Sequence, residues 1–169
     1  IKPSQSATTT YATSYFNVTG ATSTAHIFGN GNPVASVESV SGTNPRLFFT
    51  HSDHLRSISL VTDEASDIAE SVSYTPFGRI VFAAGSHREQ RKFTGHEYDA
   101  ESSYTYAKAR YLDTNFGRFL SQDPAFVAIG DRQLVGEKTG RQLEQILVDP
   151  QAMNSYAYAK NNPIKFVDP

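Results

Sequence analysis

One stretch, residues 92–124, constrains what this chain can fold into more than any other. Within it, Tyr104 and Tyr106 alternate with polar residues, which is the period of a strand that buries one face. The segment 114–117, Thr-Asn-Phe-Gly, has hairpin-turn chemistry because asparagine and glycine tolerate positive φ. Residues 118–121 are expected to form the returning strand. The pattern predicts an aromatic β-hairpin that ends at an Asp-Pro step.

Upstream of this stretch, short apolar segments alternate with turn signals such as Gly-Asn-Gly-Asn-Pro at 29–33. The spacing of about ten to twenty residues favours an all-β array over alternating strands and helices. The charged segment 87–92 is expected to be a solvated linker. We predict strands at 11–18, 24–28, 34–40, 46–51, 58–62, 68–74 and 80–82.

Downstream, the pattern changes to a helical one. Leu143, Ile146 and Leu147 are spaced so that they share one helix face, and residues 139–142 have the spacing of a capping box. Asp149 is expected to cap a second helix, which has proline at its first position and stops before Asn162-Pro163. The sequence therefore predicts a mainly β fold with a helical insertion near 125–160.

Composition narrows the possible functions. The 169 residues carry a net charge of -2, which provides no general attraction to nucleic acid or anionic membranes. Cysteine is absent, which excludes disulfides and thiol chemistry, and no apolar run has the length of a membrane span. No glycine-rich phosphate loop is present, and His51 and His54 are expected to be turn histidines rather than a metal pair. We therefore expect no cofactor and no metal.

Several ordered motifs resemble those of a known family. Arg110-Tyr-Leu-Asp113, the run from Gly117 to Pro124, the run from Asn154 to Pro163 and the closing Asp168-Pro169 are similar to the RHS-repeat-associated core domain. That domain belongs to RHS and YD-repeat polymorphic toxins and to the C subunits of Tc toxins. Residues 24–82 resemble the YD-type repeats that precede it, although Arg56 stands where the family usually has glycine. The resemblance implies repeat hairpins over 1–86 and a core domain over 87–169, with the insertion at about 125–149.

The resemblance also implies self-cleavage by an aspartyl-protease-like site shortly after the second Asp-Pro step. Asp123 and Asp168 occupy the matching positions, and Arg110 matches an arginine that could orient a carboxylate. Two close carboxylates share one proton, because like charges at short range do not both ionise cheaply. The alternative is structural, since Asp-Pro steps also end strands and Asp–Arg pairs also connect loops. Asp99 and Asp113 are expected to have turn and strand-end roles.

The implied context is a secreted or cell-surface toxin shell. The chain begins with Ile1, and we interpret it as a piece of a longer protein that should be silent alone, because the bond to be cut lies beyond Pro169. Its expected partners are the preceding repeats and a C-terminal toxin domain, with possible self-association through an open sheet edge. The alternative function is a non-catalytic structural or adhesive cap. A carbohydrate-binding version of that alternative would use the tyrosines at 98, 104, 106, 111, 156 and 158.

Overall fold

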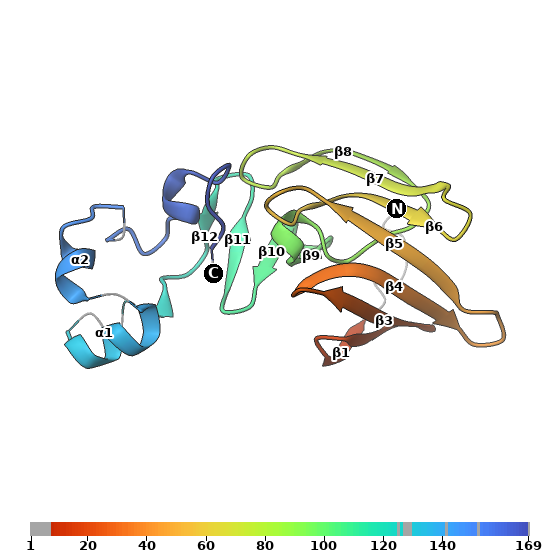
Figure 1. Cartoon of the computed structure of the whole chain (residues 1–169), viewed down its shortest axis with the longest axis horizontal. Coiled ribbons are helices and arrows are strands. Elements are labelled where there is room, and N and C mark those ends of the chain that lie inside the picture. Colours follow the sequence, from red (N-terminus) through yellow and green to blue (C-terminus); the bar gives the residue numbers. More distant parts are fainter. Residues whose placement is uncertain (1–7, 125, 127–129, 141, 152, 169) are drawn as a thin grey trace. The chain divides into compact units, whose positions relative to one another are not determined.

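The computed structural model contains two antiparallel sheets and two short α-helices (Figure 1). It describes residues 8–124, 126, 130–140, 142–151 and 153–168, apart from the side chain of Lys138. Contacts between residues divide the chain into two compact units. The first comprises residues 1–72 and 82–89, and the second comprises residues 73–81 and 90–169. The expected division at residue 87 into a repeat part and a core part stays a prediction.

The first sheet has eight strands, each hydrogen-bonded to its neighbours in sequence. Such an order arises from successive hairpins, as the alternating strand and turn signals predicted. The mainly β fold is therefore confirmed. The strands are β1 Thr9–Thr13, β2 Phe16–Thr19, β3 Thr22–Gly29, β4 Asn32–Val40, β5 Arg46–Ser52, β6 Ile58–Asp63, β7 Ile68–Tyr74 and β8 Ile80–Gly85.

In the first sheet, one predicted turn is confirmed and one predicted strand is wrong. The β3–β4 hairpin turns at Asn30 and Gly31, which have φ of 51° and 77°, as the turn signal predicted. The single strand expected over 11–18 is wrong, because the chain turns between β1 and β2. There the Tyr15 amide donates to Thr13 Oγ1 at 3.1 Å. A threonine hydroxyl thus satisfies the main chain locally and ends the strand.

The predicted solvated linker at 87–92 is also wrong. His87 stacks on the ring of Phe48 with centroids 4.0 Å apart and is only 7% exposed. Ser36 Oγ donates to Glu89 Oε2 at 3.4 Å, and Glu89 is buried as well. The residues are polar, yet stacking and hydrogen bonds give them buried partners that a solvated face would lack. Phe48 itself belongs to the apolar cluster of this unit, together with Ile58, Val61 and Ala69.

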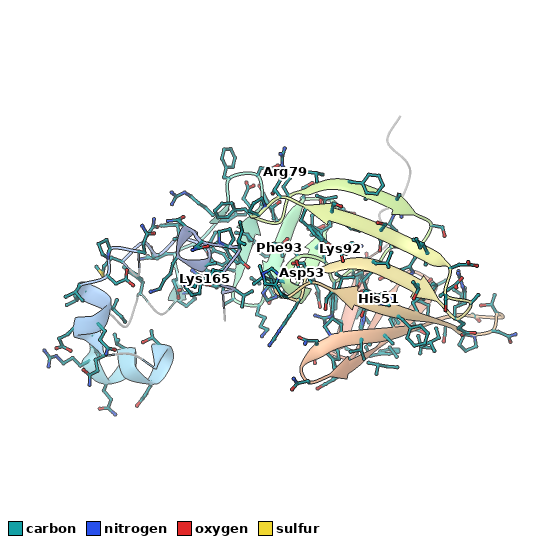
Figure 2. All side chains as sticks on the ribbon, turned by 45° about the horizontal axis from the view of Figure 1, so that its top comes forward. His51, Asp53, Arg79, Lys92, Phe93 and Lys165 are labelled. Atoms are coloured by element: carbon teal, nitrogen blue, oxygen red, sulfur yellow. The ribbon has the colours of Figure 1, made fainter. Side chains whose placement is uncertain are left out.

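The turn before β6 shows how the first unit accommodates Arg56. Oδ1 of Asp53, which is labelled in Figure 2, accepts hydrogen bonds from the amides of Leu55 and Ser57, both at 2.8 Å. Arg56 lies between these two residues with φ of 73°, in the left-handed region that favours glycine. The turn therefore keeps the conformation that the family's glycine suits, with a strained arginine in its place.

The second unit contains a four-stranded sheet in the order β12-β11-β10-β9. The predicted hairpin is present, although its returning strand is shorter than expected. A short 3-10 turn, η1 Phe93–Gly95, precedes the sheet, and the core is formed by Phe93, Leu112, Phe119, Tyr158 and Ala159. The strands are β9 Glu97–Asp99, β10 Tyr104–Ala107, β11 Arg110–Asp113 and β12 Arg118–Phe119.

The insertion forms two helices, α1 Arg132–Thr139 and α2 Leu143–Leu147. Ile146 and Leu143 pack with Val135, but Leu147 is 53% exposed, so its predicted place on the apolar face is wrong. Gln142 and Gln145 form the capping box of α2, in place of the predicted one over 139–142. Arg141 of that prediction lies outside the described residues.

The second helix predicted from Asp149 onward is wrong, because the described residues of 149–160 form turns and a short 3-10 segment, η3 Ala159–Asn161. Asn154 Oδ1 accepts from the Tyr156 amide at 3.3 Å, and Ala157 makes an isolated β-bridge with Arg118. These contacts use main-chain groups that a helix would need. None of the described helices has the length and apolar character that a membrane crossing requires.

Candidate functional site

The candidate site is built around the side chain of Arg110. Arg110 and Leu112 are buried while Tyr111, between them on β11, is exposed. This alternation directs Arg110 to the same face as the apolar core of the second unit. Its guanidinium carbon lies 3.6 Å from the centroid of the Phe119 ring, so the cation rests on an aromatic face that holds it in place.

The guanidinium of Arg110 brings together three chain segments. Nη1 donates to the main-chain oxygen of Ser155 at 3.1 Å. Nη2 lies 2.9 Å from Oδ2 of Asp168 and 3.1 Å from Oδ2 of Asp123. Because both oxygens contact the same nitrogen, they are no farther apart than the sum of those two distances, about 6 Å. That separation lies within the range at which two carboxyl groups influence each other's protonation.

The main chain around Ser155 helps to place the first acid. The amide of Phe119 donates to the oxygen of Tyr156 at 3.0 Å, which holds residues 155–157 beside β12. The Asp123 amide then donates to the oxygen of Ser155 at 3.1 Å, so Ser155 accepts from Asp123 and from Arg110. The second acid, Asp168, arrives from a separate segment that turns at Asn162, whose oxygen accepts from the Phe166 amide at 3.0 Å.

The two acids have different surroundings. Burial raises the pKa of Asp168 above its usual value. The charge of Arg110 and its hydrogen bond oppose that shift, and the negative charge of Asp123 adds to it. The carboxyl of Asp123 is the more accessible of the two, because its side chain is 34% exposed and that of Asp168 is 23% exposed. A pair of this kind is chemically able to supply an acid and a base at one place.

The structure brings all three predicted site residues together, although Arg110 and Asp168 are 58 positions apart. Their catalytic role stays a prediction, and Pro169, which borders the expected cleavage point, lies outside the described residues. The structural roles expected for Asp99 and Asp113 are confirmed. Asp99 Oδ1 accepts from the Glu101 amide at 2.9 Å, and Asp113 Oδ1 accepts from the Asn115 amide at 2.9 Å.

Sequence reasoning missed two contributors to the site. Ser155 acts through its main-chain oxygen, which no side-chain pattern reveals. Phe119 was assigned to a strand but not to the arginine, although the alternation of β12 could have placed its ring on the core face. His51 was expected in a turn, but it lies on strand β5, where its Nε2 is 3.0 Å from Thr62 Oγ1; it is labelled in Figure 2. No cluster of metal-ligating side chains occurs among the described residues.

Comparisons of the sequence with known proteins find a nuclease and a deaminase toxin among its relatives. No protein-family model matches the chain. It is 27% identical over 129 residues to a tRNA3(Ser)-specific nuclease WapA of Bacillus spizizenii, covering 75% of the chain and 5% of that protein. It is 30% identical over 130 residues to a double-stranded DNA deaminase toxin A of Burkholderia cenocepacia, covering 73% of the chain and 7% of that protein. The chain thus spans only a small part of the length of either relative.

A solved structure shares the fold. The crystal structure of TcdB2-TccC3 without its hypervariable C-terminal region matches with a TM-score of 0.67 at 21% identity, over 92% of this chain and 6% of that one. At that identity the match concerns the fold alone. Taken with the ordered motifs and the two toxin relatives, it shows that the chain belongs to the toxin-associated RHS-repeat family.

Proposed function

We propose that the chain is the C-terminal part of an RHS-repeat shell that encloses a toxin and releases it by self-cleavage just beyond Pro169. The observation that carries this proposal is the contact of one Arg110 nitrogen with the carboxyl groups of both Asp123 and Asp168. The names of the relatives, a nuclease and a deaminase toxin, support a toxin as the downstream domain.

In the proposed reaction, Asp123 is the base and Asp168 the acid. Asp123 accepts a proton from a water molecule, whose oxygen attacks the carbonyl carbon of the scissile peptide. Asp168 donates a hydrogen bond to the carbonyl oxygen and stabilises the charge that develops there. As the tetrahedral intermediate collapses, Asp123 gives the proton from the water to the leaving nitrogen and the C–N bond breaks, which leaves a carboxylic acid and an amine and consumes one water. Arg110 orients both carboxyl groups and limits their repulsion.

The test extends the chain with its natural downstream sequence and follows cleavage by intact mass. We expect the extended chain to be cut just after the Asp168-Pro169 step. Asp123→Asn should abolish the cut, because an amide does not accept the proton of the water. Arg110→Ala should slow it severely. Asp99→Asn is the control, since Asp99 serves a turn outside the site. An intact extended wild type, or cleavage by Asp123→Asn, would overturn the protease role.

The remaining context belongs to the same proposal. The preceding repeats would pair with β1, which forms one end of the eight-stranded sheet. The shell would act in a secreted or cell-surface setting, as toxins of this kind do. If no preceding repeat is present, the open edge at β1 is expected to support self-association. Sedimentation at increasing concentration tests this, and a monomer throughout would count against it.

A structural cap that never cleaves is the second candidate, and one observation favours it. The two ion pairs and the Ser155 hydrogen bond of Arg110 also form a clamp that fastens the segments 155 and 168 to β11. Such networks perturb carboxyl groups without any catalysis. The variant Asp123→Asn distinguishes the structural role from the catalytic one. An amide retains an acceptor for Arg110, so a clamp would largely survive the change while self-cleavage would stop.

A further inference from the structure

The turn η3 Ala159–Asn161 lies between the two segments, at Ser155 and Asp168, that contact Arg110. Its three residues all have left-handed φ, of 46°, 53° and 59°. Asparagine tolerates this region, whereas in alanine and lysine the Cβ atom approaches the following carbonyl oxygen too closely. Strain of this kind persists only where surrounding contacts enforce it. The turn therefore requires partners outside itself.

Two side chains of the turn are held by the segment that follows α2. Lys160 Nζ donates to Oδ2 of Asp149 at 2.5 Å, and these side chains are only 38% and 31% exposed. Asn161 Nδ2 donates to Oε1 of Gln151 at 2.6 Å, in a more exposed position. The carboxylate of Asp149 is itself fixed, because its Oδ1 accepts from the Gln151 amide at 3.0 Å. An ion pair in which one partner is already fixed loses less side-chain entropy when it forms, so it restrains the turn more effectively than two mobile side chains would.

Successive main-chain hydrogen bonds connect η3 to the segment of the second acid. The amides donate as follows: Asn161 to the oxygen of Tyr158 at 2.9 Å, Asn162 to that of Ala159 at 2.9 Å, and Phe166 to that of Asn162 at 3.0 Å. Because Asn162 is bonded to η3 through its amide and to Phe166 through its oxygen, a change in the turn shifts the chain that follows. Pro163 is buried and its ring fixes φ, which limits the freedom of this stretch further. One residue separates the connected stretch from Asp168.

We propose that the ion pair between Asp149 and Lys160 is a positioning latch, which holds η3 in its left-handed conformation and thereby brings Asp168 to Arg110. The role in cleavage rests on the proposed function. The latch itself does not, because it concerns contacts within the chain as it stands. The insertion at about 125–149 thus takes part in the site, since the residue at its end secures the segment that carries the second acid.

The first experiment measures amide hydrogen exchange by NMR on the 169-residue chain. In Asp149→Asn, an amide nitrogen takes the place of Oδ2 and does not accept from Lys160, while the acceptor for the Gln151 amide is retained. We expect the Asn161 and Asn162 amides to exchange about fivefold faster, the upper range for a partly exposed ion pair. Lys160→Met should have the same effect. The double variant should add little, because either change removes the whole pair.

Glu144→Gln is the matched control for this experiment. It breaks the ion pair between Arg132 and Glu144, which connects α1 and α2 within the same insertion. Exchange of the η3 amides should stay at the wild-type rate in this variant. Unchanged exchange in Asp149→Asn would overturn the latch, and so would an equal acceleration in Glu144→Gln or fully additive effects of Asp149→Asn and Lys160→Met.

The second experiment follows self-cleavage of the chain extended by its natural downstream sequence. Asp149→Asn and Lys160→Met should each slow the cut about fivefold, whereas Glu144→Gln should cut at the wild-type rate. Lys160→Gly also loses the pair, but glycine adopts φ of 53° without strain, so this variant should cut faster than Lys160→Met.

Two outcomes of the cleavage assay would refute positioning by the latch. One is cleavage at the wild-type rate by both Asp149→Asn and Lys160→Met, and the other is a Lys160→Gly variant that cuts no faster than Lys160→Met. An uncut wild type would refute the proposed function alone. The exchange measurement would then still decide whether the ion pair holds the turn.

Discussion

Two tight turns, one from each compact unit, use the left-handed conformation in different surroundings. In the first unit, the turn that begins at Asp53 places Arg56 at φ of 73° with its side chain exposed. In the second, the turn that begins at Thr75 places Gly78 at φ of 90° beneath the ring of Phe93, so that a Cβ would lie 2.5 Å from Cγ of that ring. The first turn therefore tolerates a side chain at the cost of strain, and the second has no room for one.

The same contrast recurs in a second pair of turns. Ser66 has φ of 67° in the turn that Asp63 Oδ1 supports, and it is exposed. Gly117 has φ of 65° in the hairpin after β11, and a Cβ there would lie 2.6 Å from the ring of Phe77. Aromatic rings thus cover these two glycine turns of the second unit. At these two positions the covering ring, in addition to the backbone conformation, explains why glycine is needed.

The largest effect is expected for Gly78→Ala. The added methyl group meets the Phe93 ring in a strained conformation, so we expect a loss of roughly 3 kcal/mol or more in the free energy of unfolding. Gly31→Ala is the control, with φ of 77° but open space around it, and should cost only about 1 kcal/mol. Urea denaturation of both variants measures the difference. Equal losses would show that the ring does not distinguish the two turns.

The next effect concerns His96, the residue that follows η1 in the second unit. Burial lowers its pKa to about 4, and the charges of Lys108 and Arg91 contribute in the same direction. Between the unfolded value of 6.5 and about 4, the unfolded chain binds a proton that the folded chain does not. The stabilisation is therefore complete above pH 6.5 and is lost as the pH falls toward 4. Because His96 is partly exposed, we expect the free energy of unfolding to fall by only about 2 kcal/mol over this pH range.

Measurement of this pH effect also tests the contrast between the two units. Hydrogen exchange at pH 7 and pH 5 should show the loss mainly in the amides of the second unit. His96→Gln should flatten the pH dependence, whereas His51→Gln should leave it in place, because the side chain of His51 is exposed. A uniform loss over both sheets would indicate that the units unfold together and that the burial of His96 has no local effect.

A smaller effect of opposite sign is expected for Arg56→Gly. Glycine adopts φ of 73° without the steric penalty, so the variant should be more stable by about 1 kcal/mol. Arg79→Gly is the control in the second unit. Arg79 follows Gly78 and is not among the described residues with positive φ, so this change should destabilise by about 0.5 to 1 kcal/mol. Thermal denaturation measures the stability of both variants. A lower stability of Arg56→Gly would show that Arg56 is not strained in this turn.

The smallest effect on stability is expected from Asp168. The pKa of Asp168 in the folded chain is raised above its unfolded value of 3.8. Its contribution to the stability of the fold is therefore complete below pH 3.8 and is lost as the pH rises through the folded pKa. Asp168→Asn, which stays neutral, should remove this dependence. Carboxyl NMR titration checks the direction directly. A value at or below 3.8 would mean that the Arg110 charge outweighs burial, and Asp123 would then be the better candidate for the acid.

Two of the sequence-based predictions failed because they did not include a partner from another segment of the chain. Leu147 matches the helical period of Leu143 and Ile146, yet α1 covers only part of α2 and leaves Leu147 outside. His87 and Glu89 belong to a charged run, but stacking on Phe48 and the hydroxyl of Ser36 retain them inside. Periodicity and polarity describe which face a side chain prefers. They do not say whether another segment will cover that face.

Local sequence patterns predicted most of the hairpins and turn residues, and the family resemblance indicated the three candidate site residues. Strand period and turn chemistry act over a few neighbouring positions, and the motifs around Arg110, Asp123 and Asp168 are short and ordered. Two contacts appear only once the chain is folded: one nitrogen of Arg110 contacts both acids, and the oxygen of Ser155 accepts from Arg110 and from the Asp123 amide. Those contacts depend on how the loops before and after Tyr158 close over the sheet, and loop closure is set by packing and main-chain hydrogen bonds that no local pattern encodes.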